Sequence, residues 1–291
     1  MPVSAQPEVT IREATPADAA VCGEICYRAF STINAEHNFP CDFPNQDVAI
    51  AIMTMLFSHP GFYNVVAESA GRIIGSNCLD ERAVIAGIGP ITVDPGVQNH
   101  GAGHALMKVV MDRAKERGAP GIRLVQAAFH NRSLALYTRL GFDIREPLAC
   151  VQGRPTERTV AGCAVRPAQS ADIEACNALS LEIHGFDRGR ELADGIQQNS
   201  AVVVERGGRI TGYASSLAFF GHATAETNVD LQALIASAES FGGPGILVPS
   251  RNTTVLRWCL DHGLRIVQTM TLMSIGLYNE PDGAWMPSVT F

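Results

Sequence analysis

The sequence predicts an α/β (α+β) fold built as two tandem domains, and three observations lead to this expectation. The chain has 291 residues, which is more than one typical domain needs. Apolar strands alternate with longer amphipathic helices through the first half. The second half then repeats short segments of the first half in the same order. We expect domains at 1–151 and 164–291, joined by a linker at 152–163.

Hydrophobic periodicity and turn residues place the elements of the first half. The predicted order is β-α-α-β-β-β-α-β-α. The expected ranges begin with a strand at 9–13, a helix from Thr15 to about Phe30, a loop at 34–45 and a helix at 48–57. They continue with a hairpin of strands 63–68 and 73–79, a strand at 88–93, a long helix ending at Arg117, a strand at 122–128 and a short helix at 133–140.

Matching segments carry the internal repeat. Residues 12–18 are similar in sequence to residues 166–172, and residues 65–75 are similar to residues 202–212. Leu124-Val-Gln followed by Asn131 is similar to Leu247-Val-Pro followed by Asn252. Because the three matches occur in the same order, we interpret the chain as a tandem duplication.

Composition excludes several classes of function. The net charge of −7 argues against nucleic-acid or anionic-membrane binding, which need basic faces. The first residues have no basic or apolar leader pattern and no apolar run is long enough to span a bilayer, so we expect a cytoplasmic protein. The 8 cysteines show no paired metal-ligand spacing, which is typical of small buried side chains in a reducing compartment.

A glycine-containing turn joins the strand ending at Val93 to the long helix. Gly101 and Gly103 have no Cβ, so a ligand can approach the backbone there closely. Unpaired amides and the helix dipole at a helix N-terminus favour phosphate. The spacing is neither the G-x-G-x-x-G of dinucleotide folds nor the P-loop of nucleotide triphosphatases. This stretch therefore predicts a different pyrophosphate-binding turn.

Two motifs resemble those of the GNAT superfamily of acyl-CoA N-acyltransferases. The first is Gln98-x-x-Gly101-x-Gly103 after Ile91-Thr-Val-Asp-Pro95, which is similar to the acyl-CoA loop of that family. The second runs from Asn131 to Phe142 and includes Tyr137. The resemblance implies, for each domain, a mixed, mostly antiparallel sheet flanked by helices. It also implies acetyl-CoA as co-substrate, and we expect no metal.

The resemblance also implies roles for individual residues. The amide of Val93 would stabilise the oxyanion, Tyr137 would return a proton to the leaving thiolate, and Glu81 would act as general base, directly or through water. Contacts with the cofactor would come from Ile91, Thr92, Val93, Gln98, Asn99, His100, Gly101, Ala102, Gly103, His104, Asn131, Ser133 and Tyr137, with Ser133 either contacting CoA or capping its helix.

Each of these residues also has a plain structural interpretation. The segment 91–93 suits a central strand, Tyr137 suits a buried ring with a satisfied hydroxyl, and Glu81 suits a surface acid. His100 and His104 have the spacing of two metal ligands on one helix face, but no third ligand is evident.

The second half departs from the first where the cofactor would bind. Between Gly212 and Leu247 there is no Gln-x-x-Gly-x-Gly, although a helix is expected at 229–238. Arg257-Trp258-Cys259 stands near the position of Tyr137, and no tyrosine is present there. We therefore expect CoA binding in the first half alone, with the second half as a scaffold and part of the acceptor pocket.

The leading hypothesis is an N-acetyltransferase that moves acetyl from acetyl-CoA to a primary amine by direct attack in a ternary complex. Cys78 is the one candidate for an acyl carrier, and no base stands beside it in the sequence. Two alternatives stay open, a non-catalytic acyl-CoA-binding sensor and a transferase of longer acyl chains. We expect the acceptor to be a small-molecule or peptide amine and the protein to be a monomer or homodimer.

Overall fold

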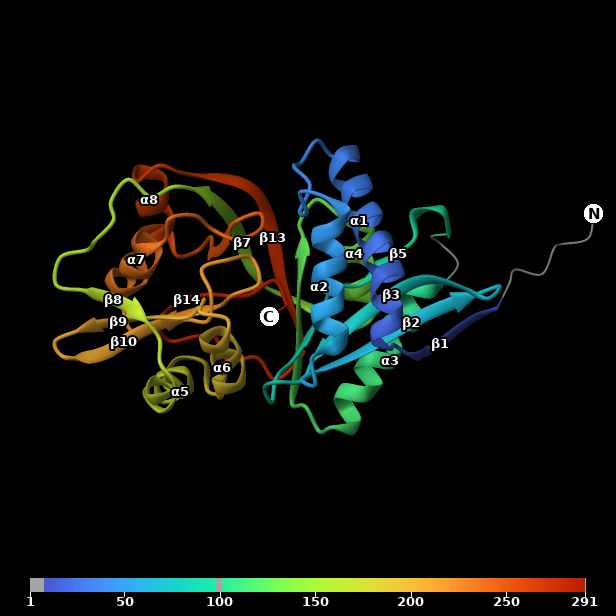
Figure 1. The fold of residues 1–291 in the computed structure, drawn as a ribbon, viewed down its shortest axis with the longest axis horizontal. Coiled ribbons are helices and arrows are strands. Elements are labelled where there is room, and N and C mark those ends of the chain that lie inside the picture. Colours follow the sequence, from blue (N-terminus) through green and yellow to red (C-terminus); the bar gives the residue numbers. More distant parts are fainter. Residues whose placement is uncertain (1–7, 98–100, 291) are drawn as a thin grey trace, which may run out of the picture. The chain divides into compact units, whose positions relative to one another are not determined.

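A computed structural model describes residues 8–97 and 101–290 of the chain (Figure 1). The chain divides into two compact units. Unit 1 comprises Met1–Glu81 and Gly87–Ala119, and unit 2 comprises Arg82–Ala86 and Pro120–Phe291. Within the described ranges, no helix has the length and apolar character needed to cross a membrane.

Unit 1 contains two long helices, a meander of strands and the helix that follows the glycine-containing turn. Its elements are β1 (Val9–Glu13), the 3-10 turn η1 (Pro16–Asp18), α1 (Ala19–Glu36), α2 (Gln46–Ser58), β2 (Phe62–Ser69), β3 (Arg72–Asp80), β4 (Ala86–Ile88, whose first residue belongs to unit 2), β5 (Thr92–Val93), η2 (Pro95–Val97) and α3 (Ala102–Glu116).

Antiparallel pairing orders the strands of unit 1. β2 pairs with β1 on one side and with β3 on the other. The free edge of β3 then receives β4 and β5, one after the other. The continuous strand predicted for 88–93 is therefore wrong. It is broken at Gly89-Pro90, because Pro90 has no N–H for the ladder and Gly89 has a φ of +143°.

Helix α1 is longer than predicted, and the loop after it is shorter. α1 continues to Glu36, so the predicted loop at 34–45 begins only at His37. The residue that leaves the helical conformation is Asn38, with a φ of +58°. Asn45 then caps α2 by accepting a hydrogen bond from the amide of Val48. The apolar faces of α1 and α2 pack with Val66 and Cys78 in one buried cluster.

Unit 2 contains the end of the first repeat and all of the second. Its elements are β6 (Gly121–Ala127), α4 (Asn131–Arg139), β7 (Asp143–Gly153), β8 (Ala164–Pro167), η3 (Ser170–Asp172), α5 (Ile173–His184), α6 (Gly189–Gln197), β9 (Val202–Arg206), β10 (Arg209–Ala214), β11 (Ala223–Ala225), α7 (Asn228–Ser237), β12 (Ile246–Pro249), α8 (Thr253–Asp261), β13 (Leu264–Gly276) and β14 (Ala284–Met286).

The two repeats exchange their last strands within unit 2. β13, the long strand of the second repeat, pairs with β6 of the first, and β7 of the first repeat pairs with β12 of the second. β7 and β13 also pair with each other, which gives the strand order β6-β13-β7-β12. The remaining strands form a separate antiparallel sheet in the order β14-β11-β10-β9-β8. Because of the exchange, the boundary at Ala119 falls inside the first repeat.

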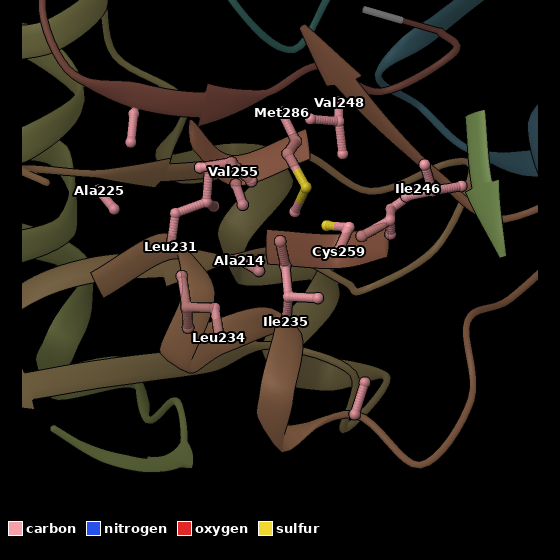
Figure 2. Close-up of a cluster of buried hydrophobic side chains, with 14 of the residues drawn as sticks. Ala214, Ala225, Leu231, Leu234, Ile235, Ile246, Val248, Val255, Cys259 and Met286 are labelled. Atoms are coloured by element: carbon pink, nitrogen blue, oxygen red, sulfur yellow. The ribbon is translucent and has the colours of Figure 1, made fainter. Parts of the chain in front are cut away.

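The largest core of unit 2 lies among α7, α8 and the strands of both sheets (Figure 2). Leu231, Leu234 and Ile235 supply the apolar face of α7, and Val255 and Cys259 supply that of α8. All five side chains are fully buried. Such burial stabilises a domain by about 1.5–3 kcal/mol for each large aliphatic side chain. Trp285 is also buried, in a second cluster of unit 2.

An ion-pair motif occurs once in each repeat and confirms the duplication in three dimensions. In the first repeat, the guanidinium of Arg12 donates to Asp18 at 2.8 Å and to Glu68 at 2.9 Å. Asp18 in turn accepts from the amide of Thr15, so the pair also fixes the start of η1. The second repeat has the same contacts, made by Arg166, Asp172, Glu205 and Gln169.

Candidate active site

A glycine positions the short strand β5 against β3. A Cβ built on Gly75 would lie 2.5 Å from the carbonyl oxygen of Thr92, so any other residue would push β5 away. Thr92 is buried, and its hydroxyl lies 3.5 Å from that of Ser76. Gly75 therefore sets the position of segment 91–93, because it has no side chain to keep that segment away from β3.

The ladder between β3 and β5 also sets the direction of the Val93 amide. Val93 pairs with Gly75, and the next amide, that of Asp94, donates to the carbonyl of Ile74 at 2.8 Å. In an antiparallel ladder this makes Val93 and Gly75 a non-hydrogen-bonded pair, whose N–H and C=O groups point away from each other. The amide predicted to stabilise an oxyanion thus points away from β3.

Asp94 fixes the turn after β5. Its Oδ1 accepts a hydrogen bond from the amide of Gly96 at 3.0 Å, and its Oδ2 pairs with Arg28 of α1 at 2.8 Å. Its carbonyl accepts from the amide of Val97 at 3.0 Å. Asp94 belongs to the first sequence motif, but Arg28 could not be predicted, because no local pattern connects two residues so far apart in the chain.

Helix α3 begins at a glycine in the left-handed region. Gly101 has a φ of +82°, and a Cβ added there would meet open space. The first helical hydrogen bond joins the amide of Ala105 to the carbonyl of Gly101, so the amides of residues 102–104 have no acceptor within the helix. These amides and the helix dipole suit a phosphate group. Gln98, Asn99 and His100 lie outside the described residues.

The rest of α3 holds this N-terminus in place. Leu106, Met107 and Val110 are fully buried, whereas His104 is exposed on the first turn. The amide of Asn77 on β3 lies within 3.5 Å of the carbonyl of Leu106. The start of the helix is therefore anchored to the sheet through its apolar face, while His104 on its first turn is exposed.

Glu81 forms ion pairs with the last turn of α3. Its carboxylate oxygens accept from Arg113 at 2.9 Å and from Arg117 at 2.5 Å. The side chain of Glu81 is only 10% exposed. Arg113 also lies over the ring of Tyr63, 4.9 Å from its centre. Both oxygens of the candidate base thus have cationic partners.

Helix α4 of unit 2 carries the second motif and begins with a histidine cap. Nδ1 of His130 accepts a hydrogen bond from the amide of Ser133 at 3.2 Å. The cap predicted for Ser133 is therefore made by His130, and the hydroxyl of Ser133 bonds the Tyr137 side chain instead. Asn131 is exposed at the first helical position. His130 was missed because histidine is not among the residues preferred at this position.

Tyr137 is buried, with only 6% of its surface exposed. Burial raises the pKa of Tyr137 to about 12, and the hydrogen bond from Ser133 opposes this shift. The hydroxyl is therefore protonated at neutral pH and able to donate a proton. The ring of Tyr137 packs edge-on against Phe142, with centres 6.3 Å apart. Gly141, at a φ of +96°, permits the sharp turn between them.

The second repeat has the same elements without the same chemistry. Helix α7 takes the place of α3, but Thr227 caps it and accepts from the amide of Asp230. The carboxylate of Asp230 is fully buried at this N-terminus and pairs with Arg206 at 2.8 Å. The start of α7 thus already holds a buried, paired carboxylate, which would repel a ligand phosphate. This supports the prediction that the second half does not bind CoA.

Helix α8 shows a similar loss. Asn252 caps α8 as His130 caps α4, and the residue seven positions after the cap is Cys259 where the first repeat has Tyr137. Cys259 is fully buried and belongs to the main core of unit 2. The catalytic hydroxyl predicted for the first repeat therefore has no counterpart in the second.

Cysteine chemistry does not add a nucleophile to this site. Cys78 is fully buried, and burial raises its pKa well above the ordinary value, so its thiolate is strongly disfavoured. Six of the cysteines are buried, as expected for small apolar side chains, but Cys41 is exposed. Among the described residues, no group of three or more His, Cys, Asp and Glu side chains is arranged to hold a metal ion.

Comparisons with known proteins agree with this geometry. Residues 28–142 match the family model of the acetyltransferase (GNAT) family. A search of curated proteins gives no match. The chain resembles several solved structures over nearly its whole length, at identities that establish the fold alone.

Three of these structures contain chains of similar length. An acetyltransferase-class protein from Pyrococcus horikoshii has a TM-score of 0.72 and 18% identity, covering 95% of this chain and 94% of that one. A GCN5-related N-acetyltransferase from Sphaerobacter thermophilus has a TM-score of 0.62 and 13% identity, with coverage of 94% and 96%. A tandem GNAT protein from the clavulanic acid biosynthesis pathway has a TM-score of 0.55 and 13% identity, with coverage of 92% and 98%. Residues 28–142 are therefore a GNAT acetyltransferase family domain, in a chain whose fold is that of two tandem GNAT-like domains.

Proposed function

We propose that the protein is an N-acetyltransferase that moves acetyl from acetyl-CoA to a primary amine by direct attack in a ternary complex. The observation that carries this proposal is the contrast between the two helix starts. The first turn of α3 follows Gly101 and suits an anion, whereas the start of α7 holds the buried carboxylate of Asp230, paired with Arg206. This contrast supports CoA pyrophosphate binding at α3 and not at α7.

Each group proposed for the transfer has a defined task. The amine nitrogen attacks the thioester carbonyl carbon, and the C–S bond then breaks. The Val93 amide stabilises the negative oxygen that forms, and removal of such a donor lowers rates by about 10²–10³. The amine loses a proton, and Tyr137 donates one to the leaving thiolate. The remaining residues of the two motifs, including Asn131 and the turn 98–104, hold the co-substrate.

The candidate general base, Glu81, already has partners on both of its carboxylate oxygens. Glu81 would have to give up an ion pair with Arg113 or Arg117 before one of its oxygens accepted a proton. A water molecule held by Glu81 would leave both ion pairs intact. An amine that already binds in its neutral form would need neither. No metal is required by any of these routes, and the acceptor is a small-molecule or peptide amine in the cytoplasm.

The release of CoA thiol from acetyl-CoA, measured against a library of amines, tests the proposal. We expect amine-dependent thiol release and a stoichiometric N-acetylated product. Tight CoA binding without turnover on any amine would instead favour the acyl-CoA sensor. Turnover only with longer acyl-CoA would identify a transferase of longer chains.

A further inference from the structure

Strand β5 carries the proposed oxyanion donor, but it is short and has one pairing partner. It consists of Thr92 and Val93, and within residues 8–97 and 101–290 it pairs only with β3. Its ladder is limited to Val93 opposite Gly75 and Thr92 opposite Ser76. Most strands in globular proteins are longer, at roughly 3–10 residues. The position of the Val93 amide therefore depends on contacts outside this ladder.

Asp94 is the residue at which β5 leaves the sheet, and both its backbone and its carboxylate are bonded. Its amide donates to the carbonyl of Ile74 at 2.8 Å, which extends the contact with β3 by one residue. Its Oδ1 accepts from the amide of Gly96 at 3.0 Å, and its Oδ2 accepts from Nη2 of Arg28 at 2.8 Å. Because Asp94 follows Val93 directly, a restraint on Asp94 also restrains the end of β5.

Arg28 extends from a helix whose backbone is fixed to the sheet. Cys22 and Cys26 of α1 are at most 1% exposed and belong to the same buried cluster as Cys78 of β3. The side chain of Arg28 is 47% exposed, so the charge of its guanidinium remains hydrated. Arg28 thus links the end of β5 to a packed helix that lies 66 positions earlier in the sequence.

This ion pair is suited to fix a position and adds little to overall stability. The side chains of Arg28 and Asp94 are 47% and 31% exposed, and exposed ion pairs contribute little to the free energy of unfolding. A catalytic group displaced by about 1 Å, however, can lower a rate by as much as about 10²-fold. Loss of the pair should therefore affect the rate of a reaction that uses the Val93 amide more than it affects folding.

We propose that Arg28 is a positioning residue for acetyl transfer, which acts through Asp94 to hold β5 and the Val93 amide in place. This inference rests on the proposed N-acetyltransferase function and adds to it a residue of α1 that lies outside both sequence motifs. Arg28 itself is assigned no contact with the reacting atoms.

Two substitutions remove the ion pair and keep the turn. Arg28→Gln removes the cation, and Asp94→Asn removes the negative charge but keeps an oxygen for the Gly96 amide. Each should lower kcat by about fivefold and leave KM for acetyl-CoA unchanged, because an oxyanion donor acts in the transition state. The double variant should lose no more than either single variant, because both changes remove the same contact. Arg28→Lys, which keeps a cation, should recover part of kcat.

Arg12→Gln is the matched control within unit 1. The side chain of Arg12 is 40% exposed and pairs with Asp18 at 2.8 Å, so this variant also loses an exposed ion pair. Its Tm should be similar to that of Arg28→Gln, and its kcat should equal that of wild type. An unchanged kcat in Arg28→Gln, or an equal loss in Arg12→Gln, would overturn the proposal.

Amide hydrogen exchange in the ligand-free protein keeps the test independent of the proposed function. The Asp94 amide, which donates to Ile74, should exchange about threefold faster or more in Arg28→Gln than in wild type, and at the wild-type rate in Arg12→Gln. Equal exchange of this amide in wild type and Arg28→Gln would overturn the role of Arg28 in holding β5. Absence of thiol release with every amine would instead refute the N-acetyltransferase function, and the exchange rates would still decide whether Arg28 holds β5.

Discussion

At the scale of single residues, the proposed chemistry depends most on Tyr137. Its hydroxyl is buried and bonded to Ser133, and its pKa of about 12 keeps it protonated. We expect Tyr137→Phe to lower kcat by about 10²-fold, because general-acid catalysis typically contributes that much or more. KM for acetyl-CoA should change little. Tyr213→Phe, which removes a buried hydroxyl of unit 2, is the control and should keep its kcat. An unchanged kcat in Tyr137→Phe would show that this residue packs against its neighbours but does not donate the proton.

The raised pKa of Tyr137 also predicts an effect of pH on stability. The folded pKa of about 12 lies above the ordinary value of about 10, so the folded state holds this proton more tightly. The corresponding stability is present below pH 10 and is lost as the pH rises toward 12, by an amount on the order of 2 kcal/mol. Chemical denaturation of wild type and Tyr137→Phe across this range should show a shallower decline in the variant. An equal decline of the free energy of unfolding in both proteins would contradict the raised pKa of Tyr137.

At the scale of elements, β5 depends on a close approach that only glycine allows. Gly75→Ala would place a Cβ 2.5 Å from the Thr92 carbonyl oxygen and displace the strand that carries Val93. We expect acetyl transfer to fall by about tenfold or more, because misplaced oxyanion donors are costly.

Gly212→Ala provides the matched control from the second repeat, at the position corresponding to Gly75. A Cβ there would lie 2.8 Å from the Cβ of Ala225, so this variant should lose stability as well. Its rate per folded molecule should stay near that of wild type, because this repeat carries no predicted catalytic group. Equal rate losses in both variants would show that overall destabilisation, and not the position of β5, is responsible.

Comparison of the predicted and observed elements shows which of them could be predicted from the sequence. Helices α2, α3 and α7 agree with their predicted ranges within about two residues, because their apolar spacing and caps are local signals. The break at Gly89-Pro90 was missed because the β-branched residues around it fit a strand equally well. The exchange of β7 and β13 was not predictable, because local patterns do not identify a strand's partner. Arg28 was missed for the same reason, since its partner Asp94 comes from a distant part of the chain.

At the scale of the whole molecule, the duplication predicts that the two ion-pair motifs contribute to stability with the same dependence on pH. Arg12 lowers the pKa of Asp18, and Arg166 lowers the pKa of Asp172, in each case mainly through a side-chain hydrogen bond. A carboxylate whose pKa is lowered in the folded state stabilises the protein at pH values above its unfolded pKa of about 4. This contribution is lost as the pH falls below that value.

Acid denaturation tests this prediction. Asp18→Asn and Asp172→Asn should each lower the free energy of unfolding at pH 7 by about 1 kcal/mol, because each loses an ion pair and an acceptor of the capping amide. Below pH 3 each variant should approach wild type. A constant difference at all pH values would mean that the carboxylate charge does not contribute.

We propose that backbone amides at the start of α3, after Gly101, bind CoA. Calorimetric titration of CoA into wild type, Gly101→Ala and Gly71→Ala tests it most directly. Both glycines have positive φ values, +82° and +71°, with open space around an added Cβ, so both variants should lose about 1–2 kcal/mol of stability through backbone strain. We predict that the Kd for CoA rises about tenfold or more in Gly101→Ala and stays at the wild-type value in Gly71→Ala, whose hairpin turn has no predicted contact with CoA. Unchanged CoA affinity in Gly101→Ala, or no CoA binding by the wild-type protein, would exclude this helix start as the CoA site.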